Sequence, residues 1–306
     1  MTPSQPSTFA LILKGILAGV VYLVATMLTG MLFSALHQPL INAAPSNADP
    51  QKSLYYFVFV APLLGPALVP LARYTAGSRL LRGLALSSLI FICIGPATIL
   101  EAKIFLTIYA HGGVLAGILA ALPPSLLCGM VLSYLLPQAQ PEISVATKWR
   151  SFFTAHTRSS WAARLALAIL AFAIAYFLFG MMVAPFVVPY YRAGILSLTL
   201  PPFSVIVPVL FVRSAMFLLA CLPFVALWTR SRLSLILSLG FAHWCLTGLL
   251  GMILVFFWPV AMRVGHGLEI GADSFAYVTA LVFLLMPRRH ENTVPTSAHV
   301  AHMFPS

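Results

Sequence analysis

The sequence predicts an all-α, polytopic transmembrane helical bundle. Hydrophobic residues make up 61% of the 306-residue chain, charged residues make up only 8%, and the mean hydropathy is +0.99. Soluble domains carry about 25% charged residues, so this composition cannot cover an ordinary water-facing surface. Several apolar stretches also reach the roughly 20 residues that a helix needs to cross the hydrocarbon core of a bilayer.

Eight apolar segments are long enough to be transmembrane spans. They lie at about 10–35, 54–72, 82–103, 113–136, 162–186, 204–227, 233–257 and 266–286. Pro and Gly in the segment 183–194 predict an external turn after the fifth span. The chain is thereby divided into 1–136 as a first four-helix half, 137–161 as a cytoplasmic basic linker, 162–289 as a second four-helix half and 290–306 as a disordered cytoplasmic tail.

The basic residues predict the orientation of these spans. When loops are assigned to alternate sides, one side receives twelve of the seventeen Lys and Arg residues: Lys14, Arg73, Arg79, Arg82, Lys148, Arg150, Arg158, Arg164, Arg230, Arg232, Arg288 and Arg289. Lys and Arg are enriched in cytoplasmic loops, so both termini are predicted to be cytoplasmic. These loops also explain the net charge of +11, which indicates a lipid bilayer rather than a nucleic acid as partner. A bacterial cytoplasmic membrane is favoured.

Matches between the two halves predict a parallel 4+4 internal repeat. Tyr22 and Tyr176 lie 154 residues apart in similar apolar contexts, and Arg79 and Arg232 lie 153 apart. The GxxxG pairs Gly113–Gly117 and Gly267–Gly271 are again 154 apart, and we expect these four glycines to serve helix packing. Two halves with an even number of spans share one orientation, as in the parallel repeats of some transporters.

Prolines predict interrupted helices. Span two contains Pro62, Pro66 and Pro70, and span six contains Pro208 and Pro223. Proline removes a backbone donor, which is tolerated in a membrane where neighbours or water satisfy the freed carbonyl. Because spans two and six correspond in the repeat, interruptions there favour a transport site.

The segment RVGHGLEIGADSFAY, residues 263–277, carries a concentration of polar groups that is unusual for this chain. At 100° per residue, six polar side chains fall within an arc of about 140° on the last helix. They are Arg263, His266, Glu269, Asp273, Ser274 and Tyr277. A carboxylate in hydrocarbon costs at least about 2.5 kcal/mol, so this face is expected to contact protein or water in the outer half of the membrane.

Three further residues are expected to join this polar face. Arg213 lies near the middle of span six and needs a counter-charge, for which Asp273 or Glu269 is the predicted partner. His243 lies near the middle of span seven, and Glu101 lies at the outer end of span three. The predicted substrate- or proton-binding residues are therefore Glu269, Asp273, Arg213, His266, Arg263, His243 and Glu101.

The sequence leaves three functions open. A transporter-like or ligand-binding protein with an outward-facing polar site is the first, because a carboxylate near an arginine favours proton coupling or recognition of a charged small molecule or lipid. The second is a membrane enzyme at the external face, either metal-assisted through His266-x-x-Glu269 or a carboxylate-based hydrolase. The third is a structural subunit whose ion pairs serve helix assembly. No cofactor or metal is expected, because no established binding motif is present.

Overall fold

The chain forms a bundle of helices, as the sequence predicts. A computed structural model describes residues 6–37, 49–107, 113–140 and 144–287. Within these ranges there are eight helical spans that are long and apolar enough to cross a membrane, and no strand beyond two isolated β-bridges. The prediction of about eight spans is therefore confirmed, and the protein has the character of a multi-pass membrane protein.

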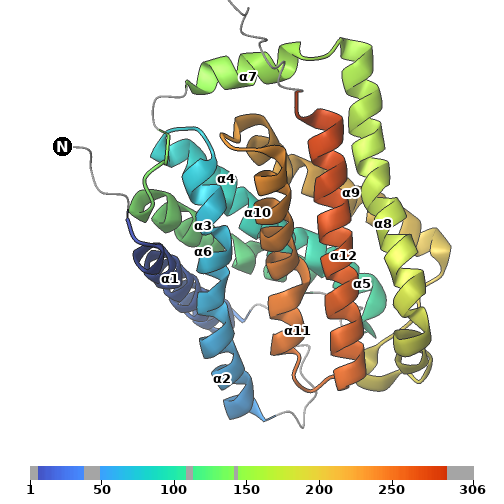
Figure 1. Ribbon diagram of the computed structural model, residues 1–306. Helices are drawn as coiled ribbons and strands as arrows, with labels where there is room; N and C mark the ends of the chain where they lie inside the picture. The colour runs from blue at the N-terminus through green and yellow to red at the C-terminus, as the bar shows by residue number, and fades with distance from the viewer. Residues whose placement is uncertain (1–5, 38–48, 108–112, 141–143, 288–306) are drawn as a thin grey trace, which may run out of the picture.

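The eight spans comprise continuous and interrupted helices (Figure 1). The continuous ones are α1 (Thr8–Ala35), α6 (Val114–Leu135), α8 (Arg158–Arg192), α9 (Phe203–Leu227) and α12 (Val260–Leu285). The interrupted ones are α2 (Pro50–Val60), η1 (Ala61–Leu63) and α3 (Leu64–Tyr74) in span two; α4 (Arg79–Ile92), η2 (Cys93–Ala97) and α5 (Thr98–Phe105) in span three; and α10 (Arg232–Trp244), η5 (Cys245–Leu249) and α11 (Leu250–Leu254) in span seven.

Span six is not interrupted, although its prolines predicted that it would be. Span two changes to a 3-10 turn at Pro62, as expected, but α9 continues through Pro208 and Pro223. The other two interruptions are π-helical, and one of them contains Pro96. The prediction for span six was wrong because proline alone does not end a helix where no water competes for the backbone.

Two segments expected to be loops are helical. Part of the predicted linker forms α7 (Val145–Thr154), which lies across one end of the bundle (Figure 1). Its Phe152 is buried against Trp161, and this apolar anchor explains why the linker is ordered there. The predicted external turn is also wrong, because α8 continues through Pro189 to Arg192 before the short turn η4 (Ile195–Ser197). The predicted tail, 290–306, lies outside the described residues.

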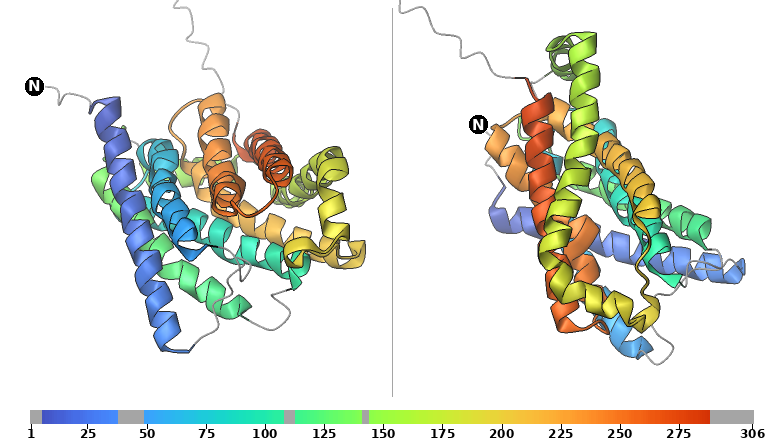
Figure 2. Two further views of the ribbon diagram at one scale, coloured as in Figure 1. Left: turned by 90° about the horizontal axis from the view of Figure 1, so that it is seen from below. Right: turned by 90° about the vertical axis from the view of Figure 1, so that its right-hand side faces the viewer.

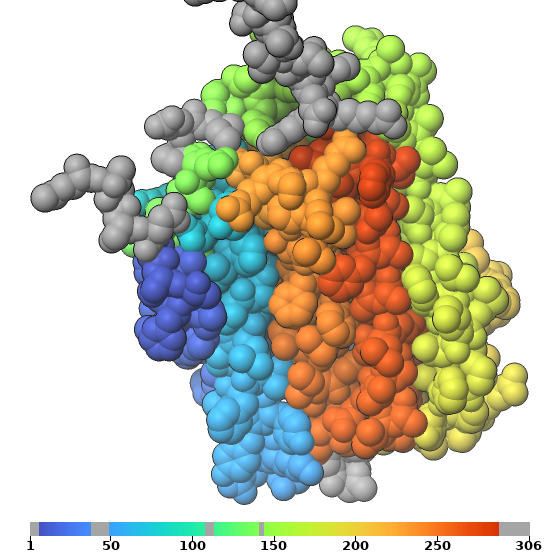
Figure 3. Space-filling view, viewed as in Figure 1, coloured from blue at the N-terminus to red at the C-terminus, as the bar shows by residue number. Residues whose placement is uncertain are grey.

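The spans form two layers of four that are inclined to each other. α2–α3, α10–α11, α12 and α8 stand side by side and form one face of the molecule (Figure 1, Figure 3). α1, α6, α4–α5 and α9 run behind them in a different direction (Figure 2). Each layer thus contains spans from both predicted halves, since span two stands beside span seven and span six stands beside span three.

The two halves are joined through the connections that follow spans two and six. Thr75 and Trp228 form an antiparallel β-bridge. The amide of Ala76 donates to the carbonyl of Leu227 at 2.8 Å, and the amide of Thr229 donates to the carbonyl of Tyr74 at 2.9 Å. These bonds satisfy backbone groups at two helix ends that would otherwise be buried without partners.

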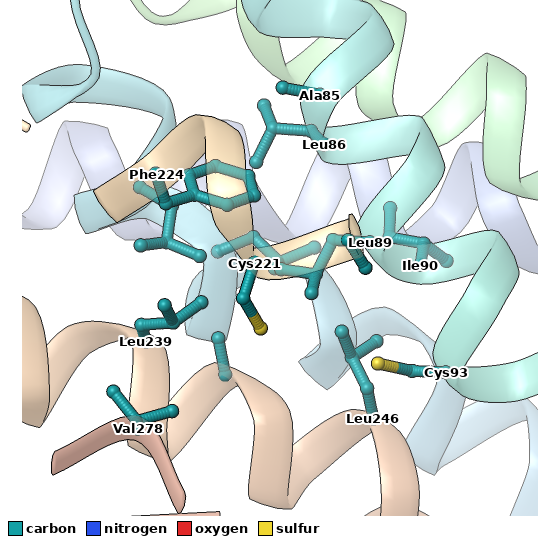
Figure 4. Close-up of a cluster of buried hydrophobic side chains, with 14 of the residues drawn as sticks. Ala85, Leu86, Leu89, Ile90, Cys93, Cys221, Phe224, Leu239, Leu246 and Val278 are labelled. Atoms are coloured by element: carbon teal, nitrogen blue, oxygen red, sulfur yellow. The ribbon is translucent and has the colours of Figure 1, made fainter. Parts of the chain in front are cut away.

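A hydrophobic core fills the space where the layers cross. It brings together side chains of α4, α9, α10 and α12, including Leu86, Leu89, Phe224, Leu239 and Val278 (Figure 4). These five side chains are fully buried. By contrast, α1 and α8 expose large apolar side chains such as Phe9 and Met182, at 76% and 65% of their area. Apolar exposure on this scale is characteristic of a surface that faces lipid.

The buried Arg82 and the partly buried Arg232 cap helix C-termini at the end of the bundle that carries α7. The Arg82 guanidinium donates to the carbonyls of Ala72, Leu136 and Ser133 at 2.5, 2.9 and 3.3 Å. Arg232 donates to the carbonyl of Met286 at 2.8 Å, beyond the end of α12. These cations satisfy carbonyls that lack intrahelical donors and lie at the negative ends of the helix dipoles.

We expect Arg82→Gln to lower the free energy of unfolding by about 2 kcal/mol or more, because several buried carbonyls lose their donor. Thermal unfolding of the purified protein in detergent measures this effect. Arg158→Gln is the matched control, since Arg158 is exposed at the start of α8 and its loss should cost less than about 0.5 kcal/mol. Equal effects of the two substitutions would contradict the capping role of Arg82.

Candidate functional site

A cavity of about 330 Å³ lies between α5, α8, α9, α10 and α12. This volume falls within the range of roughly 300–1,000 Å³ that is typical of small-molecule sites. Six of the seven predicted site residues line it: Glu101, Arg213, His243, His266, Glu269 and Asp273. Arg263 does not line this cavity. The structure therefore gathers residues that are up to 172 positions apart in the sequence around one space.

The helix α12 supplies the largest share of the polar lining. His266, Glu269 and Asp273 are spaced by three and four residues, so they project from one face of the helix. Glu269 and Asp273 are only 7% and 3% exposed. Opposite Glu269, α8 has Gly180, where a Cβ atom would lie 3.1 Å from the Glu269 Oε1 atom. A glycine at this position leaves room for the carboxylate.

Arg213 forms its ion pair with Glu101. The Arg213 Nη1 atom lies 2.6 Å from the Glu101 Oε1 atom, which joins α9 to α5. The predicted pairing of Arg213 with Asp273 or Glu269 is therefore replaced by a partner from the first half of the chain. Glu101 takes this position because the π-helical segment η2 and the following α5 bring the C-terminal end of span three against α9.

Aromatic rings enclose the Arg213 guanidinium. Its carbon lies 5.6 to 5.9 Å from the ring centres of Phe172, Tyr176 and Phe217. A cation above an aromatic face is attracted by the ring quadrupole, most strongly when both are shielded from water. The Arg213 side chain is accordingly held by one carboxylate and three rings.

His266 links two helices near the N-terminal end of α12. Its Nδ1 atom lies 2.8 Å from the Glu269 Oε2 atom, and its Nε2 atom lies 3.1 Å from the Tyr191 hydroxyl. The imidazole thus joins α12 to the end of α8. Because both ring nitrogens are engaged, the orientation of His266 is determined from both sides.

His243 occupies the deeper part of the site. Its Nδ1 atom lies 2.9 Å from the Ser274 hydroxyl, and its ring packs edge-on against Phe217 at 4.6 Å between centres. Further along the same face of α12, the Tyr277 hydroxyl donates to the carbonyl of Ser214 at 3.3 Å. Tyr277 does not line the cavity, so the predicted polar stripe ends in a helix-packing contact.

Three buried polar atoms in the cavity lining have no hydrogen-bond partner among the described residues. They are the Arg213 Nε, the His243 Nε2 and the Asp273 Oδ1 atoms. The parent side chains are at least nine-tenths buried. Buried polar groups are almost always hydrogen-bonded, so three unsatisfied atoms around one cavity indicate that a molecule completes their bonding.

The four glycines predicted to pack helices have different roles. Gly113 precedes α6 with a φ of 80°, a left-handed conformation that favours glycine, so it starts this helix. Gly117 faces Ile99 of α5. The groove at Gly267 and Gly271 receives the indole of Trp244, whose Nε1 donates to the Gly267 carbonyl at 2.8 Å. A side chain therefore fills the groove on α12, where the sequence suggested the close approach of another helix.

Several lining residues carry no recognisable signal in the sequence. Tyr176, Gly180 and Tyr191 all lie on α8. Gly180 lies in a plain apolar stretch, and Tyr176 is distinguished only by its repeat match to Tyr22. Tyr191 falls in the segment 183–194, which was predicted to be a turn. Tyr191 contacts His266 across 75 positions of the chain. Thr247 lies in the π-helical segment η5, which nothing in the local sequence distinguishes from an ordinary apolar helix.

The comparisons with known proteins identify no relative. No protein-family model matches the chain, and no curated protein or solved structure matches it significantly. In the described part of the chain, no three His, Cys, Asp or Glu side chains are grouped as metal ligands.

The Arg213–Glu101 pair should show strong energetic coupling. We expect Arg213→Gln to lower the free energy of unfolding by about 3 kcal/mol, because it leaves a carboxylate without its cation in an apolar region. In a double-mutant cycle with Glu101→Gln, the coupling energy should be about 1–3 kcal/mol. Thermal unfolding in detergent measures these values.

Lys103→Gln provides the control for this cycle. Lys103 is exposed, lies two residues from Glu101 and does not line the cavity. We expect the effects of Lys103→Gln and Arg213→Gln on the free energy of unfolding to be additive. Additivity of Glu101→Gln with Arg213→Gln would contradict a partly buried ion pair that ties α5 to α9.

Proposed function

We propose that the protein is a transporter-like membrane protein that binds a small molecule in the cavity between α5, α8, α9, α10 and α12. The observation that carries this proposal is the convergence of six charged or titratable side chains on one cavity, with three of their buried polar atoms unsatisfied. Ionisable groups are rare inside membrane proteins and mark ligand or ion pathways.

The cavity is proposed to face the external side, with both termini in the cytoplasm. The capping residues Arg82 and Arg232 lie at the same end of the bundle as the basic helix α7 (Figure 1). Glu101 belongs to α5, which ends span three at the opposite end. Enrichment of cytoplasmic loops in Lys and Arg supports this orientation.

The proposed 4+4 repeat has support from equivalent local structures. Ser78 caps α4 through the amide of Leu81, and Ser231 caps α10 through the amide of Ser234, both at 3.2 Å. A five-residue π-helical segment interrupts each of these spans. The β-bridge between Thr75 and Trp228 joins positions that are 153 residues apart, close to the proposed repeat length. A site between parallel repeats is known among transporters.

A serine hydrolase is the second candidate. The hydrogen bond between Ser274 and His243 is the contact that favours it, because a histidine can activate a serine nucleophile. Ser274 lies inside α12, however, where the backbone amides are engaged in helical bonds. They are not free to stabilise an oxyanion, which is usually the largest contribution to catalysis of acyl transfer. Ligand binding is therefore the better-supported function.

Access to the cavity tests the proposed function. We place a cysteine at Ala102, which lines the cavity beside Glu101, and treat sealed vesicles with the membrane-impermeant reagent trimethylammonium-ethyl methanethiosulfonate. Right-side-out vesicles should react, because the partly exposed side chains of Glu101 and His266 mark a path from the external side. Transport also predicts reaction in inside-out vesicles, since the site must open to each side in turn.

Two control variants show whether the reagent reaches the cysteine through the cavity. Ala184 lines the cavity, so Ala184→Trp should fill it and abolish reaction at Ala102→Cys. Ala166→Trp makes the same change at an exposed position of α8 and should leave the reaction unchanged. The chain without Ala102→Cys sets the background from its four buried native cysteines. Reaction from neither side would overturn the proposed function, and reaction from outside alone would support binding without transport.

A further inference from the structure

The acidic residues of this basic protein are concentrated in the cavity. The chain carries a net charge of +11 and contains only six Asp and Glu residues. Three of these six line the cavity, namely Glu101, Glu269 and Asp273. Among the described residues of the lining, Arg213 is the only Lys or Arg, so carboxyl groups outnumber Lys and Arg side chains there by three to one. The electrostatic character of the cavity is thus opposite to that of the whole chain.

Two of the three carboxylates already have partners. Glu101 is paired with Arg213, and Glu269 accepts from or pairs with His266. Asp273 forms no ion pair, and its Oδ1 atom is buried without a hydrogen-bond partner in the described part of the chain. A buried carboxylate without a partner is costly, so the group that completes this site is a hydrogen-bond donor carrying positive charge.

An anionic ligand is disfavoured by the same arrangement. The Arg213 Nε atom could donate to an anion, but the Arg213 charge is compensated by Glu101 and its ring-facing surface is covered by three aromatic side chains. An anion would also lie in the same 330 Å³ cavity as three carboxylates. Repulsion between like charges that share a small cavity is strong where the dielectric constant is low.

The rest of the lining is suited to an apolar ligand body. Apart from the polar groups described above, the lining is dominated by aliphatic and aromatic side chains of α8 and α9. At its edge, Met181 and Phe203 are 67% and 71% exposed, and Leu200 is 49% exposed. An apolar edge of this kind is expected to face lipid rather than water. The cavity therefore has a polar interior and an apolar edge that includes side chains of α8 and α9.

We propose that the ligand is an amphiphilic organic amine whose ammonium group binds Asp273 and whose apolar chain extends between α8 and α9 toward the bilayer. This inference rests on the proposed function, because it specifies the ligand class of the same cavity. His243 Nε2 lies in the same lining and provides a second hydrogen-bonding group for the amine or for a neighbouring polar substituent.

Three eight-carbon probes with the same apolar chain test the inference. Octylamine, octanol and octanoate are titrated calorimetrically into the full-length protein in detergent at neutral pH. We expect octylamine to bind the unmodified protein at least about tenfold more tightly than octanol, because it can pair with a buried carboxylate. Asp273→Asn should weaken octylamine binding by at least about tenfold and leave octanol binding within about twofold. Ala184→Trp fills the cavity, so the heat that remains with this variant measures partitioning of the probes into detergent.

Asp49→Asn is the matched control for the charge change. Asp49 is exposed at the start of α2, where asparagine caps a helix equally well, so octylamine binding should be unchanged. Equal binding of the three probes would overturn the inference while leaving a ligand-binding cavity in place. Tighter binding of octanoate would overturn it in favour of recognition by Arg213. If Ala184→Trp binds all probes as the unmodified protein does, the proposed function fails as well.

Discussion

The ion pair between Arg213 and Glu101 is the interaction on which the arrangement of the site depends. A guanidinium among apolar side chains is tolerated only with a compensating charge. Here Glu101, from the other half of the chain, supplies that charge. The pair ties α5 to α9, which belong to the same layer, and holds Arg213 between aromatic rings of α8 and α9. Because Arg213 pairs with Glu101, it is not available to Asp273, the partner that the sequence suggested for it.

Crossing of the two layers accounts for the position of the cavity. Parallel helices of equal length would close against each other along their whole length, whereas inclined layers separate away from their crossing point. The core around Leu89 and Phe224 fills the crossing point, and the cavity lies between α5, α8 and α12 toward the opposite end from α7 (Figure 1, Figure 4). The β-bridge between Thr75 and Trp228 lies where the chain passes between the layers. It therefore helps to fix the position of one layer relative to the other.

The number of spans and most of their limits were predictable, because the length of apolar runs is set by the thickness of the bilayer. The polar face of α12 was predictable from helical periodicity, which places His266, Glu269 and Asp273 together whatever the tertiary structure. The partner of Arg213 was not, because several carboxylates can compensate one cation and only packing selects Glu101. The extension of α8 to Arg192 was missed for a related reason: prolines that suggest a turn in water are accommodated within a helix in an apolar environment.

Charged side chains from both halves of the chain thus line one cavity, in which the Asp273 Oδ1 atom has no hydrogen-bond partner among the described residues. An electron cryomicroscopy map of the protein in lipid nanodiscs, recorded with octylamine, tests it most directly. We expect density for the amine within hydrogen-bonding distance of the Asp273 Oδ1 atom, with Arg213 still bonded to Glu101. A map in which Arg213 is bonded to Asp273, with the cavity closed by the aromatic side chains of α8, would contradict it.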